Sequence, residues 1–390
     1  MGGFGRRNGG CATALALFCL AACETAEPPA PPEPETGGAD RFRGLLWRVV
    51  SGEEPPDLHG LLAGGFNAIV LAVSDNTTAE ALDLMAPYLN RREFSVYLWF
   101  DVGRNPSLAE RRPDWVAGMG SHDDWRARFP NGPHPGEKER IGIHPWVSIW
   151  YRDVLADRQA AIERFVRGRK GLRGVFLNQI QGAPSACGCA NDQCRWTVDY
   201  RMPGGPEKVD GVPAALLLAG LKRSMPGLEW IPVCTTECEE VDQAKGGTGY
   251  CGTVQCYSGL CWKESTREME AVAREASGSI ALLLTEKSFR RELPVFKAAG
   301  GWPAFALRHF ETIPPKYGRS PIPSRRFIAV LDARGPEGRS LGEAEERALR
   351  DGAEKAGAGG VLLVRTPIDE GWEPRIIPRA ASAKSEPLTK

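Results

Sequence analysis

Strand-length apolar runs alternate with segments of helical spacing along most of this chain, and this alternation limits its fold more than any other feature. The apolar runs lie at residues 44–50, 68–73, 95–100, 174–180, 228–233, 253–258, 279–284 and 304–307. The helical segments between them lie at residues 56–63, 78–89, 153–166, 212–223, 263–276 and 289–299. Strands that are apolar throughout and alternate with helices are typical of a parallel sheet covered on both faces.

Eight such units over about 270 residues predict an α/β fold of the (β/α)8 TIM-barrel type. A doubly wound open sheet is the alternative, but no glycine-rich phosphate loop follows any of the runs. A further strand–helix–strand pattern occupies residues 327–331, 341–356 and 361–364. It is either an extra C-terminal βαβ element added to the barrel or a sign that one of the eight strands is misassigned. The first interpretation places the barrel domain at 41–312, the βαβ extension at 313–378 and a disordered tail at 379–390.

The N-terminus has the layout of a secretory signal. Two arginines precede an apolar run at residues 11–20, which is too short to span a hydrocarbon core of about 30 Å. The sequence LAAC at residues 20–23 then resembles the bacterial lipobox. That resemblance implies a lipoprotein signal peptide at 1–22, cleavage before Cys23, and acyl chains on the Cys23 residue.

The residues after Cys23 predict where the protein resides. Residue 24 is Glu rather than Asp, which favours the outer membrane by resemblance to bacterial sorting rules. Residues 23–40 are rich in Pro and Glu and cannot bury a core, so we expect an extended tether. The predicted localisation is therefore exported and lipid-anchored at the outer membrane, with the membrane as one partner.

The charge balance argues against one class of partner. Lys and Arg total 49, and Asp and Glu total 49, so the formal net charge is zero. No basic stripe runs along the chain, and we predict no nucleic-acid partner. The 11 tryptophans all lie beyond the tether, and exposed tryptophan faces stack well on sugar rings. The candidates for a polysaccharide-stacking platform lie in the long insertion at 102–150 and are Trp115, Trp125, Trp146 and Trp150.

Eight cysteines crowd into one stretch of the chain, after the predicted strands four and five. They are Cys187, Cys189, Cys194, Cys234, Cys238, Cys251, Cys256 and Cys261. An even number of cysteines in an exported protein favours disulfides, and these would staple the two loops together. A zinc site or a redox role is the alternative, although the spacings C-x-C-x4-C and C-x3-C depart from the usual zinc knuckles. No C-x-x-C-H motif for haem occurs, and we expect no cofactor and no bound metal.

Polar residues follow several predicted strands at their C-terminal ends, where barrel enzymes place their active sites. They are Asp75, Asp101, Asn178, Gln179, Glu237, Glu286 and His309. Glycoside hydrolysis requires a pair of carboxylates across such a mouth: one protonates the leaving oxygen, and the other attacks the sugar or activates water. No Ser-His-Asp order and no H-E-x-x-H motif point to a peptidase.

Over residues 41–310 the chain resembles the (β/α)8 glycoside hydrolases and their uncharacterised bacterial relatives. In the large retaining group, an Asn-Glu pair ends strand four and a Glu ends strand seven. The corresponding residues here are Asn178-Gln179 and, after the predicted strand seven, Glu286. The resemblance implies Glu286 as the nucleophile, whereas Gln179 cannot donate a proton as a carboxylic acid does. Either Glu237 or Asp101 then supplies the acid, or the barrel binds a glycan without cutting it.

The leading hypothesis is a membrane-anchored extracytoplasmic lipoprotein whose glycosidase-like barrel binds or hydrolyses a polysaccharide. The predicted catalytic residues are Glu286, Glu237 and Asp101. The predicted substrate contacts are Asn178, Gln179, Asp75, His309 and the four tryptophans of the insertion. The alternative is a non-catalytic surface or assembly lipoprotein whose disulfide-stapled barrel face binds a protein or glycan partner.

Overall fold

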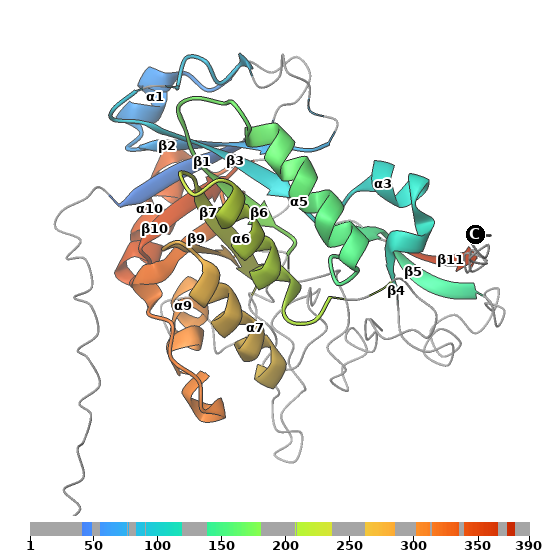
Figure 1. Cartoon of the computed structure of the whole chain (residues 1–390). Coiled ribbons are helices and arrows are strands. Elements are labelled where there is room, and N and C mark those ends of the chain that lie inside the picture. The colour runs from blue at the N-terminus through green and yellow to red at the C-terminus, as the bar shows by residue number, and fades with distance from the viewer. Residues whose placement is uncertain are drawn as a thin grey trace, which may run out of the picture. The chain divides into compact units, whose positions relative to one another are not determined.

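The computed structural model describes residues 41–48, 55–75, 77, 83–89, 91–118, 139–180, 207, 209–235, 262–284, 302–312, 314–334, 339–365 and 373–378. All of them belong to one compact unit, Asp40–Lys390. Eight parallel strands close into a barrel (Figure 1), which confirms the predicted (β/α)8 fold class. In their order around the barrel, the strands are β1 (Phe42–Arg48), β2 (Ala68–Val73), β3 (Ser95–Asp101), β6 (Leu172–Asn178), β7 (Glu229–Thr235), β8 (Ile280–Leu284), β9 (Phe327–Asp332) and β10 (Gly360–Val364).

Side chains along each strand alternate between the barrel interior and the layer beneath the helices. On β3, Tyr97 and Trp99 pack inward, and the Trp99 ring centre lies 6.0 Å from that of Phe176 on β6. The interior is therefore a packed core and not a pore. The outward side chains pack beneath α1 (Leu58–Ala63), α5 (Arg152–Val166), α6 (Pro213–Ser224), α7 (Trp262–Glu275), α9 (Trp302–Thr312) and α10 (Glu343–Lys355).

Helix α6 shows how the sequence forms such a covering helix. Pro213 occupies its first turn, where no intrahelical hydrogen bond is lost. Ala214, Leu217 and Leu221 then repeat at helical spacing and are all buried against the barrel. Short 3-10 helices complete the described connections at η1 (Pro113–Trp115), η5 (Pro314–Tyr317) and η6 (Ser324–Arg326).

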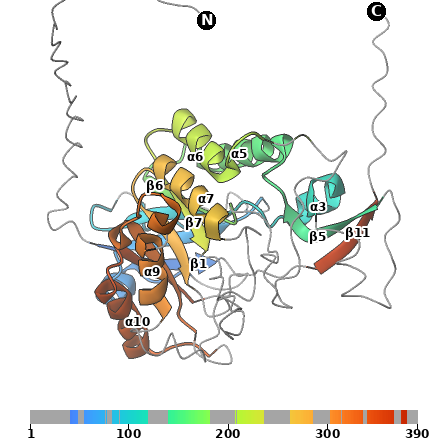
Figure 2. The ribbon, with the colours of Figure 1, turned by 90° about the horizontal axis from the view of Figure 1, so that it is seen from below.

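The long insertion after β3 forms a second, smaller sheet together with a C-terminal strand. β5 (Glu139–Val147) lies between β4 (Val116–Gly118) and β11 (Glu373–Pro378), and both pairings are antiparallel. Figures 1 and 2 show β5 and β11, with α3 (Pro106–Arg111), to one side of the barrel. The insertion is thus held in place by a strand from the far end of the sequence.

The predicted C-terminal extension is wrong, because both of its strands belong to the barrel. β9 pairs with β8, and β10 pairs with β9 and β1, so these strands close the barrel as its seventh and eighth members. Residues 304–307, predicted as the eighth strand, lie within α9 instead. Pro303 lies in the first turn of this helix, and Ala304, Leu307 and Phe310 are buried at helical spacing. The apolar run is one face of a helix.

The numbering of the barrel strands after β7 also differs from the prediction. β8, predicted as strand seven, is the sixth strand of the barrel. The run at 253–258, predicted as strand six, lies outside the described residues and is not one of the eight barrel strands. Glu286 therefore follows strand six, while strand seven ends at Asp332.

Candidate functional site

Inward-facing polar side chains gather at the C-terminal ends of three barrel strands. Asp101 ends β3 and Asn178 ends β6, and these two residues are paired neighbours in the register of the strands. Arg48 ends β1, on the same side of that strand as the interior residue Leu46. The next residue inward on β3 is the apolar Trp99. A polar cluster above an apolar core at this end of the strands is where (β/α)8 barrels bind their ligands.

Asp101 is the centre of this cluster. Its Oδ1 accepts one hydrogen bond from Trp99 Nε1 at 2.9 Å and another from Asn178 Nδ2 at 2.8 Å. Its Oδ2 faces Arg48 Nη2 at 3.6 Å and accepts no hydrogen bond from the described residues. One carboxylate oxygen is therefore fixed while the other remains open as an acceptor. The structure brings the predicted residues Asp101 and Asn178 together, and their roles remain predictions.

Arg48 was not among the residues predicted from the sequence. It is the one charged residue in the apolar run 44–50, and alternation from Leu46 places it on the interior face. Its side chain is 31% exposed, yet Nε and Nη2 are buried and have no hydrogen-bond partner in the described part of the chain. Nε and Nη2 form one edge of the guanidinium. In Arg334 the same edge donates to both carboxylate oxygens of Asp332. At the mouth the same edge faces Asp101 Oδ2 at 3.6 Å but has no hydrogen-bond acceptor among the described residues, and the oxygens of a ligand can supply one.

Gln179 directly follows the cluster and has a left-handed backbone, with φ of 62°. A residue other than glycine in this conformation costs about 1–3 kcal/mol. Its Oε1 accepts a hydrogen bond from the backbone N–H of Arg104 at 2.7 Å, which ties the segment after β3 to the end of β6. Its Nε2 is buried, and no described residue accepts a hydrogen bond from it. Gln179 therefore holds a loop in place and adds an open donor next to Asn178.

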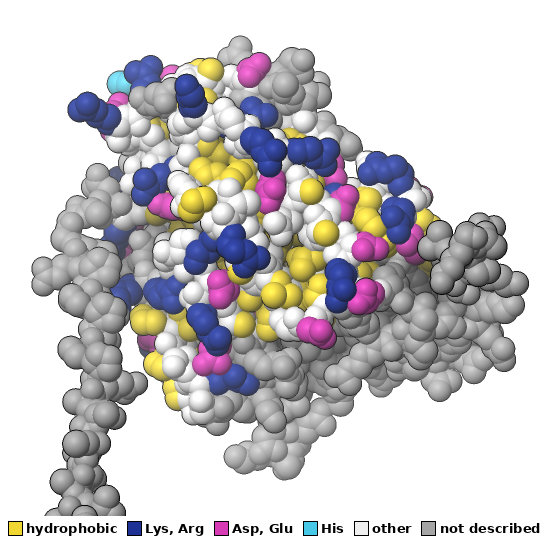
Figure 3. Space-filling view, viewed as in Figure 1, with side chains coloured by type: hydrophobic (Ala, Val, Ile, Leu, Met, Phe, Trp, Pro, Cys, Tyr) yellow, Lys and Arg dark blue, Asp and Glu magenta, His cyan; other side chains and the backbone are white. Residues whose placement is uncertain are grey.

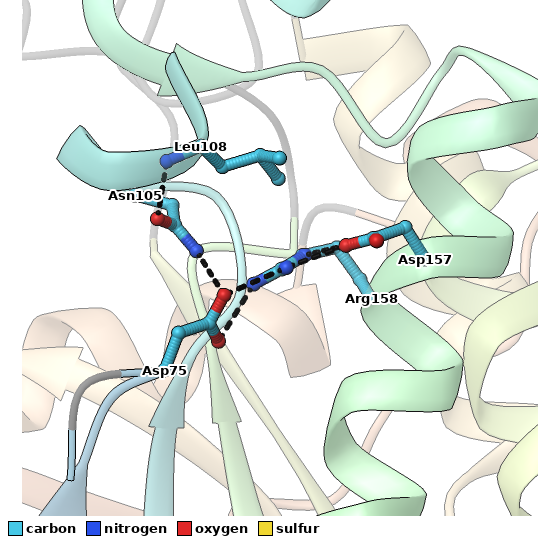
Figure 4. A network of polar contacts seen from close by, with 5 residues as sticks. All are labelled: Asp75, Asn105, Leu108, Asp157 and Arg158. Atoms are coloured by element: carbon cyan, nitrogen blue, oxygen red, sulfur yellow. Dashed lines mark hydrogen bonds and ion pairs between the residues drawn. The ribbon is translucent and has the colours of Figure 1, made fainter. Parts of the chain in front are cut away.

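Asp75, predicted as a substrate contact, belongs to a buried ion-pair network (Figure 4). Its carboxylate oxygens accept hydrogen bonds from Arg158 Nη1 at 3.0 Å and Nη2 at 2.8 Å, and the Arg158 side chain is 2% exposed. Asn105 Nδ2 donates to Asp75 at 2.7 Å, while Asn105 Oδ1 caps α3 at Leu108. Burial raises the pKa of Asp75, but Arg158 outweighs burial and holds that pKa below its usual value. Asp75 is therefore a structural residue that joins β2, α3 and α5.

Two of the four tryptophans predicted as a stacking platform are core residues. Trp146 is fully buried and Trp115 is nearly so. Trp146 packs against Gly103, where an added Cβ would lie 3.0 Å from its ring. The prediction is wrong for both residues because both side chains are buried within the folded insertion, Trp146 on β5 and Trp115 in η1. Trp150 is half-buried, and Trp125 lies outside the described residues.

Cys234 is a free thiol, so the predicted disulfide at this position is wrong. The strand predicted to end at residue 233 continues to Thr235. Cys234 therefore lies within β7, with its side chain fully buried in the layer beneath the helices, and not in a loop that could be stapled. The remaining cysteines named above lie outside the described residues: Cys23, Cys187, Cys189, Cys194, Cys238, Cys251, Cys256 and Cys261.

The burial of Cys234 predicts its reactivity. Burial, with the negative charge of Glu268 second, raises the pKa of this thiol well above its ordinary value, and only the thiolate is nucleophilic. Iodoacetamide should leave Cys234 unmodified in the native protein and alkylate it once the chain is unfolded without reductant. Mass spectrometry of the digest measures both results. A bridged Cys234 peptide in the unreduced digest would contradict the structure.

The remaining predicted site residues are Glu237, Glu286 and His309. Glu237 and Glu286 lie outside the described residues, and Glu286 follows strand six rather than the strand seven that the family resemblance requires. Strand seven ends at Asp332, whose two oxygens accept hydrogen bonds from Arg334 Nε at 2.8 Å and Nη2 at 2.7 Å. His309 lies in α9, outside the barrel, and not at a strand end as predicted.

Surface and composition features add little to this site. Among the described residues, no group of three His, Cys, Asp or Glu side chains could hold a metal ion. None of the described helices combines the length and the apolar character needed to cross a membrane. Basic and acidic side chains are intermixed over the described part of the face in Figure 3. The polar cluster at the mouth is therefore the feature that best supports a functional site.

No protein-family model matches the sequence, and no curated protein matches it significantly. Similar solved structures include alpha-L-fucosidase isoenzyme 2 from Paenibacillus thiaminolyticus, with 14% identity, a TM-score of 0.42, and 83% of this chain and 46% of that chain covered. The glycoside hydrolase domain of PgaB (BpsB) from Bordetella bronchiseptica has 13% identity and a TM-score of 0.42, with 85% and 94% covered. The chitinase catalytic domain from Pyrococcus furiosus has 9% identity and a TM-score of 0.38, with 83% and 85% covered. The chain spans less than half the length of the fucosidase, and similarity at these levels carries no conclusion about activity.

Proposed function

We propose that this chain is a lipoprotein held outside the cytoplasm at the outer membrane through Cys23, and that its barrel binds a polysaccharide at the C-terminal mouth. The signal-like N-terminus and the lipobox resemblance support the anchor. The observation that carries the binding function is the polar cluster of Arg48, Asp101 and Asn178.

The anchor is tested by labelling with palmitate. We expect the wild type to be labelled and Cys23→Ser not to be labelled; equal labelling of both would refute the anchor.

The hydrogen-bonding groups of the cluster suit a sugar. Hydroxyl groups both donate and accept hydrogen bonds. Asp101 Oδ2 accepts no hydrogen bond from the described residues, and Arg48 Nε and Nη2 are buried donors without a described hydrogen-bond partner, although Nη2 lies 3.6 Å from Asp101 Oδ2. A buried donor without a partner costs about 1–3 kcal/mol, so a ligand that satisfies these groups gains free energy on binding. Trp99 and Asn178 hold the carboxylate in place, which limits the entropy lost when the sugar binds.

Hydrolysis is the second candidate, and the position of Asp101 favours it. Two donors on a single carboxylate oxygen suit a group that acts as a nucleophile or base. A glycosidase also needs a carboxylic acid to protonate the leaving oxygen. Asp75 and Asp332 each accept two hydrogen bonds from one arginine and do not suit this task. In this proposal the acid comes from the segments after β7 or β8, as Glu237 or Glu286.

Substitution of Asp101 tests this function. A panel of polysaccharides is measured for binding and for release of reducing ends with the wild type and Asp101→Asn, which keeps the size of the side chain. We expect binding to weaken about tenfold or more, because a charged hydrogen bond contributes about 1.5–3 kcal/mol. Any hydrolysis should fall by about 10²–10⁴-fold.

The matched control is Asp351→Asn, which removes an exposed carboxylate on α10. This variant should behave as the wild type does. Equal glycan binding by wild type and Asp101→Asn, or no binding to any member of the panel, would refute the proposed function.

A further inference from the structure

A cavity lies on the outside of the barrel, between α1 and α10. Its volume is about 480 Å³, within the usual range of small-molecule sites of about 300–1,000 Å³. Gly60, Gly64 and Phe66 line one side, and Arg347 and Arg350 of α10 line the other. The two walls are joined by a hydrogen bond from Arg350 Nη1 to the backbone oxygen of Gly64 at 2.9 Å. None of these residues belongs to the cluster at the mouth.

Three of the charged groups around this cavity already have hydrogen-bond partners. Arg365 donates from Nε to Glu346 Oε1 at 2.8 Å and from Nη2 to Glu346 Oε2 at 2.9 Å. Asp57 Oδ2 accepts the backbone N–H of Gly60 at 2.7 Å and so caps α1. Arg365 and Glu346 therefore neutralise each other, while Asp57 is held in place as a helix cap.

The two arginines of α10 are different. Arg350 Nε is buried without a hydrogen-bond partner, and no described carboxylate lies within ion-pair distance of this guanidinium. Arg347 is exposed and forms no ion pair with the described residues. Because the two arginines are three residues apart on one helix, their side chains leave the same face. Asp57 and Glu343 are the remaining carboxylates in the cavity wall, and neither forms an ion pair with Arg347 or Arg350 among the described residues, so these two arginines are the cationic groups available to a ligand.

Burial holds the pKa of Arg350 below its ordinary value. The positive charges of Arg43 and Arg347 lower this pKa further, while the carboxylates of Glu346 and Asp351 act in the opposite direction. The guanidinium lies 4.9 Å above the ring of Phe66, which holds it in place but supplies no counter-charge. A bound anion would pair with the arginines and satisfy Arg350 Nε.

We propose that this cavity binds a small, sugar-sized ligand through a phosphate or carboxylate group held between Arg347 and Arg350. Arginine presents donors in a fixed fork that matches the oxygens of either group. The volume accommodates one or two sugar rings beside the anion. The site lies outside the barrel, and its binding of an anion does not depend on glycan binding at the mouth.

Calorimetric titration of the full chain tests the site with glucose 6-phosphate, glucuronate and glucose. We expect one equivalent of at least one of the two anions to bind, and glucose not to bind; the tighter anion identifies the group that the site prefers. Arg347→Gln and Arg350→Gln should each weaken binding about 10–100-fold, as expected for loss of a charged hydrogen bond. Lys355→Gln removes an exposed charge at the end of the same helix and should leave the affinity unchanged.

Arg350 also contacts Gly64 and Phe66, so the exposed Arg347 provides the variant that leaves the fold intact. The inference is overturned if neither anion binds up to about 10 mM, which is about tenfold above the dissociation constant of a weak specific site, about 1 mM. It is equally overturned if Arg347→Gln and wild type bind with the same affinity, or if glucose binds as tightly as the anions.

Discussion

A chain that ends at residue 312 will not unfold cooperatively, because it lacks the last two strands of the barrel. β9 and β10 are buried along their whole length, and they pair with β8 and β1. A buried apolar side chain contributes about 1.5–3 kcal/mol. Losing both strands therefore removes more than about 10 kcal/mol, which is comparable to the whole stability of a typical domain of about 5–15 kcal/mol. Thermal unfolding followed by circular dichroism measures the result.

The matched control for this truncation is a chain that ends at Pro378. It retains every described strand, including β11, and should show the same unfolding transition as the full chain. A cooperative transition at the same temperature in the chain ending at residue 312 would mean that the first six strands form a stable domain. That outcome would contradict closure of the barrel by β9 and β10.

Replacing Arg158 with methionine should lower the free energy of unfolding by about 3–5 kcal/mol. The change keeps the volume of the side chain but removes both hydrogen bonds to Asp75, which leaves a partly buried carboxylate without its partner. Arg152→Met on the same helix is the control, because Arg152 forms an exposed ion pair with Glu207 at 3.0 Å. That pair should contribute at most about 1 kcal/mol. Urea denaturation of both variants gives the comparison, and equal losses would contradict the network in Figure 4.

The same ion pair predicts a pH dependence. Because the pKa of Asp75 is lowered in the folded state, the pair stabilises the protein above the ordinary pKa of 3.8 and loses its effect as pH falls through the folded value. The difference in unfolding free energy between wild type and Arg158→Met should therefore shrink below about pH 4. A difference that stays constant from neutral pH into this acid range would show that protonation of Asp75 does not weaken the ion pair.

The barrel could be predicted because its strands are apolar along their whole length. The run at 68–73 has the same bounds as β2, and every residue in it is buried. The run at 304–307 is equally apolar but lies in a helix, because a short buried helix face and a short buried strand look alike in sequence. β5 includes charged residues and a proline and pairs with β11 near the end of the chain. No local pattern in the sequence predicts a pairing between such distant segments.

The candidate site could be predicted where a residue ends a strand. Asp101 and Asn178 were found in this way, since adjacent parallel strands bring their ends together. Asp75 met the same criterion, but its partner Arg158 lies 83 residues later in the sequence, and only the folded chain shows the pair. Arg48 could have been predicted from the alternation of side chains along β1, because a single charged residue on the interior face of an apolar strand indicates a specific role.

A crystal structure of the protein with an oligosaccharide from the polysaccharide panel tests the central claim most directly. The account predicts a sugar ring at the C-terminal mouth, with one hydroxyl group donating to Asp101 Oδ2 and oxygen atoms accepting from Arg48 Nε and Nη2. Trp99 and Asn178 should keep their hydrogen bonds to Asp101 Oδ1. A sugar bound elsewhere on the molecule, with Arg48 and Asp101 untouched, would contradict it.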